Sequence, residues 1–448
     1  MTSILIRNAQ VITLDGQDRI LPSADIAISD GIILALGPAP DGFQPDEVIE
    51  AADHVALPGF FNAHTHAAMT LERGWAEDLP LDRWFNERVW VAESALREDD
   101  VYWGAALAAC EMIRGGTVAF ADHYFWVDQV ARVVEESGLK ALLAWCVFGL
   151  GAEQEIGGTT LERTVSFVRE FGDAAGGRIQ TILGPHSPYV CSPEFLARVT
   201  RESERLGVGV HLHLSESQGQ FDACMAQHGK SPATLVADLG LLDRPSIAAH
   251  CLYLTQTDMG VLAKKGTTVA NCSKTYMKLS MGVAPVLDLL RLGVNVAIGT
   301  DGPASNNNLD MLESTRLAVL VQKLHSGDPE ALPSLAALRL ATQAGARALG
   351  FSNSGELAPG RSADLILMDL RRPHLCPRHD VAANVVHAAQ SADVSHVMVN
   401  GRLLLRDKHM LTMDEERIRY EAEKRAFRMV NQNLHAVRHY RSWPWPKA

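Results

Sequence analysis

Two histidines one residue apart stand at the end of an apolar segment, where His64 and His66 follow the run Pro58-Gly59-Phe60-Phe61-Asn62-Ala63. Side chains of an extended strand alternate between its two faces, so these two imidazoles share one face. Two neutral imidazoles on one face can chelate a divalent transition metal. A single pair of this kind is more often incidental, so its meaning depends on what else the chain supplies.

Three later apolar runs carry polar residues of the same kind at or near their ends. The first contains His211 and His213 and is followed by Glu216. We expect His211 to be a buried structural group and His213, which lies nearer the end of its run, to be functional. The next two runs lead to His250 and Asp301. An aspartate after a strand is by itself often a turn former or helix cap.

Taken together, these residues predict a metal site with its own acid–base groups. Three imidazoles and one carboxylate make a ligand set of the zinc type, formed by His64, His66, His213 and Asp301. Such a site lowers the pKa of bound water to about 7. Glu216 and His250 remain to move protons, which predicts metal-assisted hydrolysis. We expect one divalent ion, Zn²⁺, although nitrogen and oxygen ligands also accept Fe²⁺ or Mn²⁺.

The elements that must position these residues alternate between short apolar runs and longer helical stretches over residues 59–355. Strands are expected at 118–121, 141–147, 180–183, 209–214, 246–249, 267–270 and 294–298, and helices at 101–114, 193–206 and 309–323. This alternation indicates an α/β fold in which seven or eight units close a TIM-like (β/α)₈ barrel. The active sites of such barrels lie at the carboxyl ends of the strands, where the candidate residues fall.

Both ends of the chain have the pattern of short strands. Asp30-Gly31 and Asn400-Gly401 each interrupt an apolar run, which predicts two tight hairpins. We expect residues 1–58 and 356–410 to form one small β-sandwich domain beside a catalytic barrel of residues 59–355. Residues 411–448 are expected to form a helical extension that begins with a capping box of Thr412 and Glu415. Exposed Trp443 and Trp445 would allow this extension to pack on a neighbouring copy of the chain, so a homo-oligomer is considered beside a monomer.

The composition excludes several other classes of protein. The 448 residues include 41 Lys and Arg against 53 Asp and Glu, a net charge of −12, which disfavours a nucleic-acid-binding surface. A membrane protein is not expected, because no run of about 18 apolar residues occurs. Seven scattered cysteines without a CxxC pair indicate neither a disulfide framework nor a thiolate zinc site. With no secretory leader pattern at the N-terminus, a cytoplasmic enzyme is expected.

The segment Leu57–His66, together with His213, His250, Thr300-Asp301-Gly302 and Gly355–Leu365, resembles the amidohydrolase superfamily. More narrowly it resembles the chlorohydrolase/deaminase branch, which includes S-adenosylhomocysteine and 5′-methylthioadenosine deaminases and s-triazine hydrolases. The resemblance implies a single metal ion bound by His64, His66, His213 and Asp301. It also implies that Glu216 protonates the ring nitrogen next to the attacked carbon, that His250 assists at the nucleophile, and that Asp301 accepts the proton of the water.

The same resemblance implies substrate contacts. Glu93 matches a glutamate that binds ribose in adenosine-type deaminases, and His186 matches a histidine near the substrate. Lys274 and Tyr276, in the stretch after the predicted strand 267–270, are expected near the pocket and to influence ring specificity.

These matches predict a hydrolytic deaminase that acts on carbon–nitrogen bonds of cyclic amidines, with a heterocycle and water as its reactants and ammonia released after hydroxide attack. The expected substrates are adenosine-type nucleosides: S-adenosylhomocysteine, 5′-methylthioadenosine or adenosine. The alternatives are an aminohydrolase of guanine or another oxo-purine, a pterin or an s-triazine, or a chlorohydrolase. An inactive binding protein on this fold is disfavoured, since such proteins usually lose metal ligands and all four are present.

Overall fold

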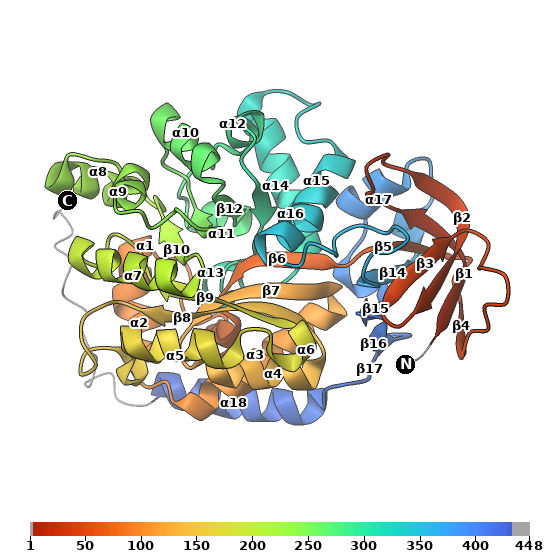
Figure 1. The fold of residues 1–448 in the computed structure, drawn as a ribbon, viewed down its shortest axis with the longest axis horizontal. Coiled ribbons are helices and arrows are strands. Elements are labelled where there is room, and N and C mark those ends of the chain that lie inside the picture. The colour runs from red at the N-terminus through yellow and green to blue at the C-terminus, as the bar shows by residue number, and fades with distance from the viewer. Residues whose placement is uncertain (1–2, 432–448) are drawn as a thin grey trace.

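Eight parallel strands form a barrel at the centre of the molecule in this computed structural model, which describes residues 3–431 (Figure 1). The barrel strands are β6 (Phe60–Thr65), β7 (Thr117–Tyr124), β8 (Lys140–Val147), β9 (Ile179–Pro185), β10 (His211–Leu214), β11 (Ile247–His250), β12 (Thr268–Asn271) and β13 (Val296–Ile298). Strands β6–β9 pair in order, as do β10–β13. A bridge between Leu183 and Val210 joins the two sets, and the Asp301 amide donates to the His64 carbonyl where β13 returns to β6. The predicted (β/α)₈ barrel is therefore confirmed.

Helices cover the outside of the barrel, and most of them pack apolar side chains against the buried strands. The larger ones are α3 (Glu98–Arg114), α4 (Val127–Ser137), α5 (Leu161–Phe171), α7 (Pro193–Leu206), α8 (Gln218–His228), α9 (Pro232–Asp238), α10 (Gln256–Lys265), α12 (Val286–Arg291), α14 (Met311–Ser326), α15 (Ser334–Ala341) and α16 (Gln343–Ala348). The helix expected at 193–206 has these bounds because Ser192 caps it, Pro193 opens it and Gly207 ends it in the left-handed conformation.

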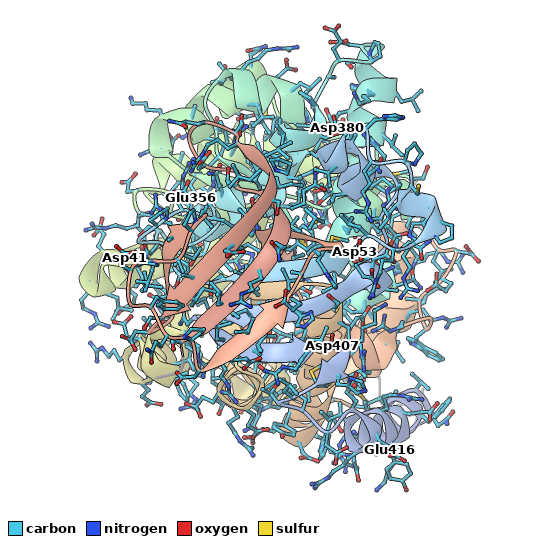
Figure 2. All side chains as sticks on the ribbon, turned by 90° about the vertical axis from the view of Figure 1, so that its right-hand side faces the viewer. Asp41, Asp53, Glu356, Asp380, Asp407 and Glu416 are labelled. Atoms are coloured by element: carbon cyan, nitrogen blue, oxygen red, sulfur yellow. The ribbon has the colours of Figure 1, made fainter. Side chains whose placement is uncertain are left out.

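A separate β-rich region is built from both chain ends, as expected, and has its own hydrophobic core. Its strands are β1 (Ile4–Ile12), β2 (Ile20–Ser29), β3 (Ile32–Leu36), β4 (Glu47–Glu50), β5 (His54–Pro58), β14 (Leu365–Asp369), β15 (Val394–Val399), β16 (Arg402–Arg406) and β17 (His409–Met410). They hydrogen-bond into one nine-stranded sheet, in which the two chain ends meet where β5 pairs with β14 (Figure 2). Both predicted hairpins form, with positive φ at Asp30-Gly31 and Asn400-Gly401.

The C-terminal helix, α18 (Glu415–Asn431), packs along α3 below the barrel in Figure 1. It begins after Asp414, whose carboxylate accepts from the Arg417 amide, whereas the hydroxyl of Thr412 has no hydrogen-bond partner among the described residues. The predicted cap at Thr412 is therefore wrong, because the helix begins at Glu415 and Asp414 takes the capping position. Trp443 and Trp445 lie outside the described residues.

Short helical segments cover the end of the barrel at which the strands terminate. They are η1 (Ala67–Glu72), α1 (Leu81–Trp84), η2 (Phe85–Val89), α2 (Trp90–Glu93), α11 (Ser273–Lys278) and α13 (Pro303–Asn306). They belong to the connections that leave the carboxyl ends of β6, β12 and β13, which is the end where barrel enzymes place their active sites. Among the described residues, none of the helices has the length and apolar character needed to cross a membrane.

Candidate metal centre and active site

The two histidines of the first apolar run meet Asp301 at the point where the barrel closes. His64 lies in β6 and is fully buried, and His66 immediately precedes η1. The Oδ1 atom of Asp301 lies 3.5 Å from Nε2 of His64 and 3.4 Å from Nε2 of His66. Three of the four predicted ligands thus converge on one point inside the barrel.

His213 completes this cluster from β10, with its Nε2 atom 3.3 Å from Nε2 of His66. The Nδ1 atom of His213 lies 2.9 Å from the carbonyl oxygen of His186, and Nδ1 of His66 lies 2.6 Å from the carbonyl oxygen of His123. A carbonyl oxygen only accepts, so each Nδ1 carries a proton and, in the neutral ring, each Nε2 presents a lone pair. Two lone pairs at this separation repel unless a cation lies beside them.

His64 is oriented in a similar way by a neighbouring histidine. Its Nδ1 atom lies 2.8 Å from Nε2 of His211, and its own Nε2 has no hydrogen-bond partner among the described residues. Metal-binding histidines characteristically use the second ring nitrogen for such a fixing hydrogen bond. The three Nε2 atoms and the Oδ1 atom of Asp301 therefore fit a divalent ion bound by nitrogen and oxygen.

The protonation states at this cluster suit metal binding. Burial lowers the pKa of His64 to about 4. Burial, followed by the nearby His186, also lowers the pKa of His213 well below its usual range. Burial alone would raise the pKa of Asp301, but the neighbouring imidazoles of His64 and His66 bring it well below its ordinary value. Burial lowers the pKa of His66 as well, but the nearby Asp301 outweighs burial and raises that pKa overall. Metal binding requires the neutral imidazole, so an ion that binds here displaces a proton from His66 when that ring is charged.

Glu216 and His250 form a second pair beside the cluster. The Nε2 atom of His250 lies 3.6 Å from Oε1 of Glu216. The other carboxylate oxygen of Glu216 accepts from the Tyr189 hydroxyl at 3.0 Å and from the Gln220 side-chain amide at 3.4 Å. Both predicted acid–base residues are buried and line the same pocket as His213. Tyr189 and Gln220 fix the direction in which Glu216 points.

The backbone is strained at two of these residues. Asp301 has φ 63° and His250 has φ 76°, in the left-handed region that non-glycine residues rarely adopt. The Gly302 amide donates to Oδ1 of Asp301 at 2.8 Å, and the Ser305 hydroxyl donates to Oδ2 at 2.9 Å. Such strained positions cluster at functional sites, where the surrounding contacts hold them in place.

A pocket at this end of the barrel brings the site residues together. It is lined by His66, Met69, Leu81, Trp84, Phe85, Val89, Trp90, Glu93, His123, Tyr124, Phe125, Cys146, Phe148, His186, His213, Glu216, His250, Thr275, Leu279, Asp301 and Ser305. His64 lies beneath it, with its ring 4.8 Å from that of His66. Three of the four candidate ligands, the acid–base pair and both predicted substrate residues therefore share one cavity.

Glu93 is 4% exposed and ends α2 on the wall of this pocket. Burial raises its pKa to about 7, although the nearby Tyr124 hydroxyl acts in the opposite direction. Glu72, in η1, is also buried, and neither of its carboxylate oxygens has a hydrogen-bond partner among the described residues. Burial and then the charge of Glu93 raise the pKa of Glu72 well above its usual range. Glu93 thus lies close to a second buried carboxyl group, that of Glu72, which the sequence analysis did not identify.

His186 and His211 both lie next to ligand candidates. The ring centroid of His186 is 4.5 Å from that of His213, and burial lowers the pKa of His186 to about 3. His211 is fully buried and contacts His64, in agreement with the expectation of a structural group. His186 therefore faces the pocket as a neutral imidazole, whereas His211 supports the wall behind it.

Lys274 and Tyr276 do not line the pocket. Lys274 pairs with Glu313 at 2.5 Å. The Tyr276 hydroxyl accepts from the Cys272 amide at 2.8 Å and donates to the His250 carbonyl at 3.3 Å. No contact with the pocket supports the predicted influence of these two residues on ring specificity. The hydroxyl of Tyr276 instead holds the backbone of His250.

His123 is a site residue that sequence reasoning missed. It lies in β7, lines the pocket, and has no hydrogen-bond partner on either ring nitrogen among the described residues. One ligand atom each from His66, His123 and His213 lie within 4.8 Å of one another, and the same holds for His64, His213 and His250. The sequence pattern could have identified it, because His123 follows the apolar run at 118–121 just as the other candidate residues follow their own apolar runs.

Comparisons with known proteins agree with this geometry. Residues 55–404 match the model of the amidohydrolase family. A 5-methylthioadenosine/S-adenosylhomocysteine deaminase from Pelotomaculum thermopropionicum is 46% identical over 96% of this chain and its own full length. A 5′-deoxyadenosine deaminase from Methanosarcina barkeri is 42% identical over 96% of this chain and 99% of its own. The structure of an adenosine deaminase from Xanthomonas campestris with bound zinc superposes with a TM-score of 0.91, at 33% identity over 95% of this chain and 98% of that one.

Proposed function

The chain belongs to the amidohydrolase family, and on this basis we propose that it is a metal-dependent hydrolytic deaminase of adenosine-type nucleosides. The observation that carries the proposal is the convergence of His66 and His213, whose Nε2 lone pairs face each other at 3.3 Å beside Asp301. Glu216 and His250 lie in the same pocket, so a proton donor stands next to the place where a metal fits.

The proposed ligands are His64, His66, His213 and Asp301. When bound, a divalent ion supplies a Lewis acid that makes water a nucleophile at neutral pH. Zinc is the ion we propose, since the similar adenosine deaminase structure contains it, with Fe²⁺ and Mn²⁺ as alternatives. Six of the seven cysteines are buried and all are free, which supports a reducing, cytoplasmic location.

The chain's own residues manage the protons of the reaction. Deamination adds water to the ring carbon that bears the amino group and releases ammonia. Asp301 is ionised and accepts a proton from the water at its carboxylate, and His250 holds the water through its ring nitrogen. Glu216 delivers a proton to the adjacent ring nitrogen, which makes that carbon more electrophilic. When the carbon–nitrogen bond breaks, the proton held by Asp301 goes to the departing amino group to give ammonia, and the proton of the new hydroxyl group returns to Glu216 as the ring carbonyl forms. Tyr189 donates to Glu216 at 3.0 Å and keeps the carboxyl group directed at the ring.

Glu93 and His186 are the proposed substrate contacts. A carboxylate accepts hydrogen bonds from two vicinal hydroxyls, so Glu93 suits the 2′ and 3′ hydroxyls of ribose. His186 faces the pocket beside His213 and is neutral, so one of its ring nitrogens can accept and the other donate. A buried carboxylate on the pocket wall supports a nucleoside site over one for a free base.

The alternative substrates are less well supported. Guanine, pterin and s-triazine rings carry no ribose and leave Glu93 buried without a partner for its charge. Chloride is a better leaving group than ammonia and gains less from protonation by Glu216. The two relatives described above are named as deaminases of adenosine derivatives.

The test is ammonia release by zinc-loaded protein with adenosine, 5′-methylthioadenosine, 5′-deoxyadenosine, guanine, a pterin and a chlorotriazine, with chloride followed in parallel. We expect turnover of the adenosine compounds at least 100-fold faster than of the others. Turnover restricted to a free base, the pterin or the triazine would overturn the nucleoside assignment and leave the metal chemistry intact.

A further inference from the structure

We propose that Glu72 and Tyr124 position the ribose-binding carboxylate of Glu93 through a chain of two hydrogen bonds. In this chain Glu72 is a neutral carboxylic acid that donates to the Tyr124 hydroxyl, and that hydroxyl donates to the ionised Glu93. The proposal rests on the proposed function, because that function assigns the ribose hydroxyls to Glu93. It goes further by giving a task to a buried acid and a buried phenol that the proposed mechanism does not use.

The three side chains come from three different elements and meet at the wall of the pocket. Glu72 belongs to η1, Glu93 ends α2 and Tyr124 ends β7. Glu93 and Tyr124 line the pocket, whereas Glu72 does not and is only 1% exposed. The Tyr124 hydroxyl lies near both carboxyl groups and lowers the pKa of each. Glu72 therefore acts on a bound nucleoside only through these neighbours.

Buried polar groups of this wall are left without partners in residues 3–431. Neither oxygen of Glu72 has a hydrogen-bond partner there, and the Tyr124 hydroxyl has none. Arg73, the next residue after Glu72, pairs instead with Glu111 at 2.5 Å. An ionised carboxylate without a partner in a buried site is costly, so Glu72 is expected to keep its proton. A protonated carboxyl group is a donor, so Glu72 and Tyr124 can satisfy each other.

The protonation states of the three groups follow from burial and from their mutual charges. Burial, followed by the charge of Glu93, raises the pKa of Glu72 well above its usual range. Burial raises the pKa of Glu93 to about 7. Burial and then the two carboxyl groups raise the pKa of Tyr124 well above its ordinary value. Because two carboxylates in one dry site repel, above about pH 7 the single negative charge lies on Glu93 and the proton stays on Glu72.

These states define the direction of each hydrogen bond. The carboxyl group of Glu72 has one hydrogen to donate, and the hydroxyl oxygen of Tyr124 accepts it. The Tyr124 hydroxyl then donates to Glu93, and a hydrogen bond to an ionised acceptor is stronger than one between neutral groups. Each bond in such a chain polarises the next, which stabilises the charged form of Glu93. The remaining lone pairs of Glu93 are available to the ribose hydroxyls in the pocket.

A matched pair of substitutions at Glu72 tests the chain. Glu72→Gln is neutral and keeps a donor for Tyr124, whereas Glu72→Met has a similar size and no donor. The readout is the ratio of kcat/KM for adenosine to kcat/KM for 2′,3′-dideoxyadenosine, measured with zinc-loaded protein at pH 8. We expect Glu72→Gln to keep the wild-type ratio and Glu72→Met to lower it about tenfold, with dideoxyadenosine itself little affected.

Two results at this position would overturn the proposal. A wild-type ratio in Glu72→Met would show that Glu72 does not act on Glu93. An equal loss in both variants would show that Glu72 acts through a charge and not as a neutral donor. Failure of the unmodified protein to deaminate any adenosine compound would instead overturn the proposed function.

Tyr124→Phe gives an independent test that needs no catalysis and does not depend on the folding of Glu72→Met. It keeps the aromatic ring and removes only the hydroxyl. We expect Tyr124→Phe to weaken binding of the product inosine about tenfold in isothermal titration calorimetry, and to leave 2′,3′-dideoxyinosine unaffected. Adding Glu72→Met to Tyr124→Phe should cause no further loss, because both substitutions break the same chain.

Unchanged affinity for inosine in Tyr124→Phe, equal weakening of the two ligands, or additive losses in the double variant would each contradict the proposal. A purely structural role for Glu72 or Tyr124 would weaken both ligands alike. Circular dichroism establishes that each variant is folded before affinities and ratios are compared.

Discussion

At the scale of single residues, the site works by giving neighbouring groups different protonation states. Burial keeps the imidazole of His64 neutral, with a pKa of about 4, while the neighbouring imidazoles of His64 and His66 keep Asp301 ionised against the effect of burial. The hydroxyl of Tyr189 and the amide of Gln220 direct the carboxyl group of Glu216 without contacting the cluster. Each group is therefore prepared for one task before substrate arrives.

Glu216→Gln separates metal binding from proton transfer. The variant keeps the shape of the side chain but cannot donate a proton, so kcat for deamination should fall by about 10²–10⁴. The metal content, measured by atomic emission, should not change, because Glu216 is not among the proposed ligands. Glu87→Gln is the matched control, since Glu87 is an exposed carboxylate that pairs with Arg83 at the surface. An unchanged rate in Glu216→Gln would remove this residue from the mechanism.

Glu93→Gln should weaken adenosine much more than 2′,3′-dideoxyadenosine, because the carboxylate is proposed to bind the hydroxyls that the second compound lacks. Burial raises the pKa of Glu93 to about 7, so the group is ionised above that pH and protonated below it. The preference for adenosine should therefore fade as the pH falls from 8 to 6. The Glu93→Gln variant should show a flatter dependence. Parallel profiles in the two proteins would mean that Glu93 does not bind the ribose.

At the scale of elements, the site depends on how β13 returns to β6. The amide group of Asn62 links the two strands: its Nδ2 donates to the Thr300 hydroxyl at 2.7 Å, and its Oδ1 accepts from the Thr300 amide at 3.0 Å. The Asp301 amide then donates to the His64 carbonyl. This closure holds Asp301 in its left-handed conformation opposite the two histidines.

Asn62→Ala should loosen that closure. Loss of the buried hydrogen bonds should lower the free energy of unfolding by about 1–3 kcal/mol. Affinity for zinc, measured by competition with a chelator, should fall by about 10–100-fold, as is typical when a residue that supports a ligand is lost. Asn86→Ala, at an exposed helix position, should change both quantities little. Undiminished zinc affinity in Asn62→Ala would show that β6 and β13 hold Asp301 without this link.

The strands and helices that carry the site residues could be predicted, because the sequence patterns that identify them are local. Apolar runs that end in histidine or aspartate identify β10, β11 and β13 and the residues they present. The helix at 193–206 was predictable from its cap, its proline and its terminal glycine. The start of α18 was not, because Thr412 has the sequence pattern of a cap but the chain turns helical only after Asp414.

The parts of the site that were not predictable depend on contacts distant in sequence. Glu72 follows Leu71 without a periodic pattern, and only the fold buries it next to Glu93. Tyr189 acquires a role because its loop meets Glu216 from another strand. Lys274 was expected at the pocket from its place after a strand, but Glu313 on α14 draws its side chain away.

At the scale of the whole molecule, the two chain ends meet in one sheet that packs beside the barrel (Figure 2). A buried ion pair joins the two regions, in which Nζ of Lys140, at the start of barrel strand β8, lies 2.5 Å from Asp364. The Asp364 carboxylate also accepts from the Ser354 hydroxyl at 2.5 Å and from the Asn400 amide at 2.8 Å. All of these groups lie at the end of the barrel strands opposite to the catalytic pocket.

Lys140→Met should destabilise the protein without changing its chemistry. Removing one partner leaves the Asp364 charge buried and unpaired, which should cost about 3–5 kcal/mol in a denaturant titration. Lys230→Met, which breaks an exposed pair with Asp238, should cost about 1 kcal/mol or less. The kcat of folded Lys140→Met should equal that of the wild type. Similar losses of stability in the two variants would show that the pair between barrel and sheet is not important for holding them together.

The most direct test of the whole proposal is removal and return of the metal. Protein treated with a chelator and dialysed should contain no metal and should release no ammonia from 5′-methylthioadenosine. Addition of one equivalent of Zn²⁺ should restore full ammonia release with one bound ion per chain, and His213→Ala should neither retain the ion nor recover activity. Ammonia release at the original rate from protein shown to be free of metal would contradict the proposed function.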